Sequence, residues 1–85
     1  MAIVFIPPQI QKLTGVSQVE VPGSNVREVV EQMEQRFPGI ARRLCDDGQL
    51  CPGLQLSVDQ VMTRMLSTKV EPTTEVHFLP AIGGG

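Results

Sequence analysis

The residues whose type and spacing most clearly suggest a chemical role are three consecutive glycines at the end of the chain, Gly83, Gly84 and Gly85. The stretch from Pro80 to Gly85 spans up to ~20 Å when extended. Because glycine has no Cβ, these residues are conformationally free and can enter a channel too narrow for a larger side chain. A bare glycine run is also typical of a frayed terminus or an expression remnant. A phosphate-binding loop is excluded, since no helix follows and no Lys or Ser/Thr is placed as in a P-loop.

The other chemically competent residues are few. His77 is the only histidine, and no Ser/Asp or Cys arrangement accompanies it, so we expect a solvated residue on the outer face of a strand rather than a catalytic base. Cys45 and Cys51 could form a bridge under oxidising conditions or supply half of a metal site. Without further Cys or His ligands nearby, a zinc site is not expected. The sequence therefore predicts two ordinary thiols, no metal site and no independent catalysis.

Composition restricts the class of protein. The 85 residues are 41% hydrophobic and 19% charged, with a formal net charge of −2, which indicates one globular domain. The lack of a basic block and of Trp and Tyr disfavours nucleic acid or an anionic membrane as a partner. The longest apolar run, 2–6, is far too short to span a membrane, and no signal-peptide pattern surrounds it. We expect a cytoplasmic protein.

Four segments have the pattern of β-strands, and they must position the glycine end. The first, 2–6, is apolar at both parities, which suits a central strand covered on both faces or one beside an exposed apolar patch. The segments 17–21, 54–58 and 75–79 alternate between apolar and other residues. The first two are expected to pair antiparallel. The last ends at Pro80, so the glycines leave directly from the final strand.

One helix is strongly indicated over 25–36. Its apolar residues recur at helical spacing and form a single stripe: Val26, Val29, Val30, Met33 and Phe37. Asn25 is the expected N-cap, and Glu28 is expected to complete a capping-box pair with it. Pro38 and Gly39 end the helix.

The remaining segments are less clear. The stretch 40–44 is expected to form a short helical turn, followed by a polar loop at 46–48. In 59–74 we expect a short strand or turn with four core residues: Val61, Met65, Leu66 and Val70. Together the elements predict an α+β fold with one main helix packed on one face of a mixed sheet. This domain would cover 1–80, followed by a flexible tail over 81–85.

The order of elements and the ending resemble the ubiquitin-like β-grasp proteins of the MoaD/ThiS sulfur-carrier family. That family commonly finishes Pro-Ala-Val-Ala-Gly-Gly, which is similar to 80–85 here. Two family turns differ: Asp59-Gln60 stands where Asn-Gly is usual, and 72–74 where Asp-Gly-Asp is frequent. The other segments that carry the resemblance are Phe5 to Pro8, Leu13 to Gly15, Asn25 to Val30, Arg36 to Ile40 and Asp47-Gly48. The chain length is nearer to the molybdopterin-synthase and cysteine-pathway carriers than to the thiamin-pathway ones.

The resemblance implies a protein co-substrate rather than an enzyme. In such carriers a partner, an E1-like adenylating enzyme, uses ATP to adenylate the terminal carboxylate, here that of Gly85. A sulfur donor then converts it to a thiocarboxylate, while Gly83 and Gly84 thread into the partner. The sulfur would serve the biosynthesis of molybdopterin, cysteine or thiamin. The acceptor would be a molybdopterin-synthase large subunit or a cysteine-synthase-like enzyme, and the chain would bind no cofactor itself.

Residues near the tail are candidates for partner docking. Leu79 points opposite to Val76 and Phe78, and Phe5 and Ile82 are proposed to share its surface. The alternative is that Leu79 packs under the segment 59–74. Two other functions stay open: a ubiquitin-like modifier joined to lysines through Gly85, and a plain interaction domain whose tail has no role.

Overall fold

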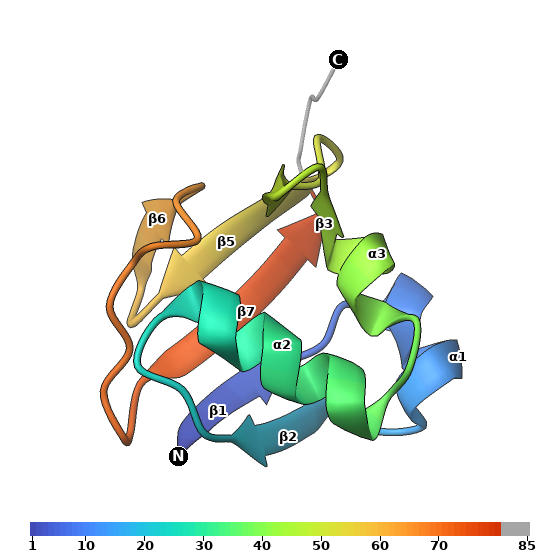
Figure 1. The fold of residues 1–85 in the computed structure, drawn as a ribbon, viewed down its shortest axis with the longest axis horizontal. Coiled ribbons are helices and arrows are strands. Elements are labelled where there is room, and N and C mark those ends of the chain that lie inside the picture. Colours follow the sequence, from blue (N-terminus) through green and yellow to red (C-terminus); the bar gives the residue numbers. More distant parts are fainter. Residues whose placement is uncertain (81–85) are drawn as a thin grey trace.

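The computed structural model describes residues 1–80. Five strands form one mixed sheet in the order β2-β1-β7-β5-β6 (Figure 1). Only the β1–β7 pair is parallel; the other three pairs are antiparallel. This arrangement confirms the expected mixed sheet. The strands are β1 (Ala2–Phe5), β2 (Gln18–Val21), β5 (Leu54–Val58), β6 (Val61–Thr63) and β7 (Glu75–Pro80).

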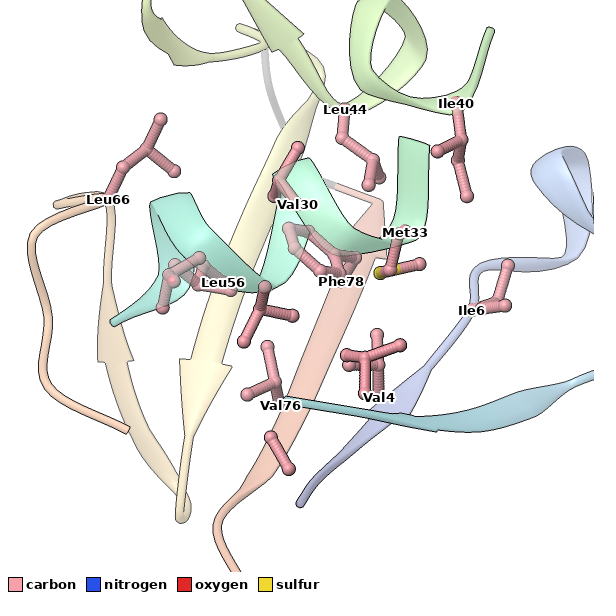
Figure 2. Packing of buried hydrophobic residues seen from close by; sticks show 14 of the residues in the cluster. Val4, Ile6, Val30, Met33, Ile40, Leu44, Leu56, Leu66, Val76 and Phe78 are labelled. Atoms are coloured by element: carbon pink, nitrogen blue, oxygen red, sulfur yellow. The ribbon is translucent and has the colours of Figure 1, made fainter. Parts of the chain in front are cut away.

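Helix α2 (Val26–Arg36) lies across one face of this sheet, as predicted (Figure 1). Its apolar stripe and the alternate residues of the strands form a single hydrophobic core. Figure 2 shows Val30 and Met33 over Phe78 of β7, which is only 1% exposed. The expected inward residues of β5 and β7 are all buried: Leu54, Leu56, Val58, Val76 and Phe78.

Two sets of side-chain hydrogen bonds stabilise the first turn of α2. The Asn25 side chain accepts a hydrogen bond from the Glu28 amide at 2.9 Å, which confirms it as the N-cap. The Glu28 carboxylate, however, binds the amide and hydroxyl of Ser24, so the reciprocal half of the capping box is shifted by one residue. These bonds to Ser24 favour the ionised form and lower the pKa of Glu28.

Five small elements connect β1 to β2 and α2 to β5. A 3-10 turn η1 (Pro8–Ile10) and a helical turn α1 (Gln11–Thr14) fill the first connection. After α2 come α3 (Ile40–Leu44), β3 (Cys45–Asp46) and β4 (Gln49–Leu50). The amides of Gly39 and Ala41 donate to the Glu34 carboxylate, which fixes α3 to α2 and lowers the pKa of Glu34.

The segment 59–74 begins with a tight turn into the edge strand β6. Asp59 and Gln60 both have positive φ, 48° and 71°, as the turns of two-residue hairpins require. The Asp59 carboxylate accepts from the Glu75 amide at 3.0 Å and ties this turn to β7. The family turn is therefore kept although Asn-Gly is absent.

The core prediction for this segment was right for two residues and wrong for two. Leu66 and Val70 are buried, whereas Val61 and Met65 are 66% and 64% exposed. Val61 lies on the edge strand β6 immediately after the turn, and Met65 follows that strand. An edge position leaves these side chains without a neighbouring strand to cover them.

Candidate functional site

The candidate site is the end of β7, where the chain leaves the sheet. β7 lies between β1 and β5, so hydrogen bonds on both sides hold its direction. The strand runs one residue beyond the predicted end, because Pro80 still pairs with Leu54. Four predicted site residues, Ile82, Gly83, Gly84 and Gly85, lie outside the described residues. The sheet thus gives the segment 81–85 a fixed starting point.

The outer face of the sheet, opposite α2, carries a row of side chains that crosses four strands. The register places Phe5 beside His77, His77 beside Ser57, and Ser57 beside Met62. The rings of Phe5 and His77 stack at a centroid distance of 4.1 Å with an interplanar angle of 4°. His77 Nε2 also lies 3.6 Å from Glu75 Oε1.

This stack corrects the expectation of a simply solvated histidine. His77 is half-buried against Phe5, so one ring face of the candidate docking residue Phe5 is occupied. Sequence reasoning missed the contact because it joins residues from opposite ends of the chain. The parallel pairing of the first and last strands, which the fold implies, was the signal that could have revealed it.

Leu79, the other described docking candidate, is on the same outer face, opposite Gln55 in the register. Its exposed fraction is 38%, so it is not enclosed by the segment 59–74. A shallow hollow of about 450 Å³ is lined by Gln55, the register partner of Leu79, and by Met62, Thr63 and Arg64. Leu79, Met62 and the Phe5–His77 stack form a partly apolar surface next to the end of β7, which we call the outer-face surface.

The two cysteines are free thiols in the β3–β4 region. Cys51 Sγ lies 3.5 Å from the Arg43 carbonyl oxygen. Burial raises the pKa of both thiols, and each is raised further by a neighbouring group, Cys51 for Cys45 and Asp46 for Cys51. A raised pKa disfavours the thiolate, which is the nucleophilic form. These environments do not activate either cysteine.

The described residues show neither a cluster of metal ligands nor a membrane-spanning helix. Residues 1–80 contain no group of three or more His, Cys, Asp or Glu side chains arranged to hold a metal ion. Within the same residues, no helix has the length and apolar character needed to cross a membrane.

A model of the ThiS family matches residues 4–85, nearly the whole chain. The chain belongs to the ThiS family. This membership confirms the predicted ThiS/MoaD-like ubiquitin-fold sulfur carrier. A search of curated protein sequences found no match.

Solved structures of ThiS-like folds agree with this assignment. One chain of the Amycolatopsis orientalis BexX/CysO complex is 28% identical, with complete coverage of both chains and a TM-score of 0.90. Mycobacterium tuberculosis CysO, an antigen, is 27% identical, with 96% and 100% coverage of the two chains and a TM-score of 0.90. The small archaeal modifier protein 1 of Methanosarcina acetivorans is 18% identical over 99% and 95% of the chains, with a TM-score of 0.82. The last similarity shows the shared β-grasp fold alone.

Proposed function

We propose that this ThiS-family chain carries sulfur as a thiocarboxylate on Gly85. The observation that carries the proposal is the position of β7. It is an internal strand of the sheet, it ends at Pro80, and the sequence continues through Ala81 and Ile82 to the glycines. A rigid body that fixes the start of a short segment ending in three glycines suits a reactive end that must enter another protein. The family match through residue 85 supports this assignment.

The chemistry requires a partner because an α-carboxylate is ionised at neutral pH and is a poor electrophile. An E1-like adenylating enzyme would join a carboxylate oxygen of Gly85 to the α-phosphorus of ATP and release pyrophosphate. A sulfide sulfur would then attack the acyl carbon and displace AMP, which leaves the thiocarboxylate. The partner uses ATP; this chain contributes the acyl group and binds no cofactor. It is a protein co-substrate and not an enzyme.

Two kinds of protein partner follow from this chemistry. One is the adenylating enzyme, and the other is a sulfur acceptor of the molybdopterin-synthase large-subunit or cysteine-synthase-like type. The similar Amycolatopsis chain occurs in a complex with BexX, which supports binding to a protein partner. We assign docking to the outer-face surface, with Leu79 and Phe5, and to Ile82 in the following segment.

The test is the intact mass of the chain after incubation with a cognate adenylating enzyme, ATP and sulfide. We expect one oxygen-for-sulfur exchange at Gly85 that requires both ATP and sulfide. Deletion of Gly84 and Gly85 should abolish the exchange, and Gly84→Val should reduce it because a side chain obstructs threading. Gly53→Ala is the matched control: a Cβ at Gly53 meets no atom within 4 Å, so its mass change should equal that of the unmodified sequence.

Three outcomes contradict the proposal. One is an unchanged mass with an enzyme that demonstrably adenylates the chain. Another is a ladder of isopeptide-linked products in cell lysate without sulfide release, which favours a ubiquitin-like modifier. The third is full activity after deletion of the two glycines, which favours a plain interaction domain.

A further inference from the structure

A second cavity lies on the side of the molecule where α2 begins, and it shares Arg64 with the hollow lined by Gln55 and Met62. Its volume is about 340 Å³, and it lies between the first turn of α2, the β3–β4 turn and the segment after β6. Two guanidinium groups from different elements line it, those of Arg27 and Arg64, together with Gly48, Leu50 and Met65. Nothing in the proposed sulfur chemistry uses these residues.

Arg64 is fixed in place by backbone carbonyls. Its Nη1 donates to the Leu54 oxygen, and its Nη2 donates to the oxygens of Leu50 and Cys51 at 3.1 and 3.3 Å. Its Nε–H and second Nη1–H have no acceptor among residues 1–80. Because Leu54 pairs with Pro80, this positive charge is held beside the end of β7.

Arg27 has only a weak contact, a 3.5 Å hydrogen bond from its Nη1 to the Gly48 oxygen. Among the described residues, Lys69 pairs with Glu71 and the His77 ring contacts Glu75, and neither Arg27 nor Arg64 forms an ion pair with a carboxylate within 1–80. The backbone amide of Arg27, in the first turn of α2, is not available to bind an anion. The Arg27 amide already donates to the Leu66 oxygen at 2.9 Å.

We propose that this cavity, which we call the two-arginine pocket, binds an Asp or Glu side chain of a partner protein. Guanidinium groups bind carboxylates through paired N–H donors, and two unneutralised guanidiniums in one cavity favour an anionic occupant. Met65 is 64% exposed and lines the same cavity, so an apolar residue next to the acidic one packs on it. This inference rests on the proposed function in one respect, that the chain docks on other proteins.

The test is an NMR titration of the isotope-labelled full chain with the peptide acetyl-Leu-Glu-Glu-Leu-amide. We expect shifts of the Arg27 and Arg64 Nε–H signals and of the Ser67 amide, which lines the pocket. The isosteric peptide acetyl-Leu-Gln-Gln-Leu-amide should bind at least ~5-fold more weakly, because it lacks the charge-assisted hydrogen bonds.

Arg27→Glu should weaken binding of the acidic peptide by at least ~5-fold, because the introduced carboxylate repels the carboxylates of the peptide. Arg64 is not substituted in this test, because its removal would also break the hydrogen bonds that hold the backbone of segment 50–54. The matched control is Lys12→Glu, with the same change in net charge on the exposed side of α1; Figure 1 places α1 near the other end of α2. Binding by this control should stay within ~2-fold of the unmodified chain, because screening weakens distant surface charges.

Four results overturn the inference: equal binding of the Glu and Gln peptides, equal losses in the two variants, shifts with inorganic phosphate but not with the peptide, and no shifts at all. Failure here is separable from failure of the sulfur-carrier function. The titration uses no ATP, sulfide or adenylating enzyme, and the mass experiment does not depend on Arg27.

Discussion

The two faces of the sheet are built from the same strands but have different tasks. Phe78 and Leu79 are consecutive in β7, yet Phe78 is 1% exposed in the core and Leu79 is 38% exposed on the opposite face. α2 covers the inner face, whereas the outer face carries the Phe5–His77 stack and the partly exposed Leu79. Folding stability therefore depends mainly on one face, and the other can be adapted to a partner at little cost.

The largest effect is expected from the inner face. Phe78→Ala should lower the free energy of unfolding by ~3–5 kcal/mol, because it removes a fully buried ring and leaves a cavity. Urea denaturation followed by circular dichroism measures this change. If the alanine variant does not fold, the free energy of unfolding can be measured for Phe78→Leu, which is a smaller change in side-chain volume.

The control for this prediction is the adjacent residue. Leu79→Ala should change the free energy of unfolding by less than ~1 kcal/mol, since a surface side chain loses little packing on truncation. Similar losses for the two positions would show that the outer face is also part of the folding core, and the division between the faces would be wrong.

A middle-sized effect is expected at the stack on the outer face. His77→Ala should cost ~1 kcal/mol, the usual contribution of an aromatic pair. His77→Phe should restore most of the loss, because it keeps a ring beside Phe5. Thermal and urea unfolding measure both variants. A loss in the phenylalanine variant equal to that in alanine would assign the effect to the Glu75 contact instead of the stack.

Much of the fold could be predicted because its signals are local. The stripe of α2, its Asn25 cap and the alternation in β5 and β7 are periodic patterns within one segment, and all are confirmed. The β3–β4 hairpin was predicted only as a polar loop, although Asp47-Gly48, with φ of 54° and 77°, is a strong hairpin signal.

The site was less predictable because its contacts join distant segments. The Phe5–His77 stack depends on parallel pairing of the first and last strands, and the two-arginine pocket on three elements meeting. The Glu28 carboxylate bonds to Ser24 instead of Asn25, which is a smaller difference between the sequence-based prediction and the structure. A capping motif gives the residue types, while the backbone geometry selects the partner.

The smallest effect on stability, and the most informative for function, is expected for Leu79→Asp. The side chain is already partly in water and faces away from the core, so the free energy of unfolding should change by less than ~1 kcal/mol, the limit expected for Leu79→Ala. Binding to the adenylating or sulfur-accepting enzyme should weaken by at least ~10-fold, because a buried interface leaves a new carboxylate unpaired. Calorimetric titration against the isolated partner measures this loss. Gln35→Glu is the matched control: it introduces the same charge at an exposed position of α2, which covers the opposite face of the sheet. Binding by this control should stay within ~2-fold of the unmodified chain, because screening weakens distant surface charges. An equal loss in the control would mean that added negative charge weakens binding wherever it is placed, whereas unfolding of Leu79→Asp would show that Leu79 belongs to the core and would remove the distinction between the two faces.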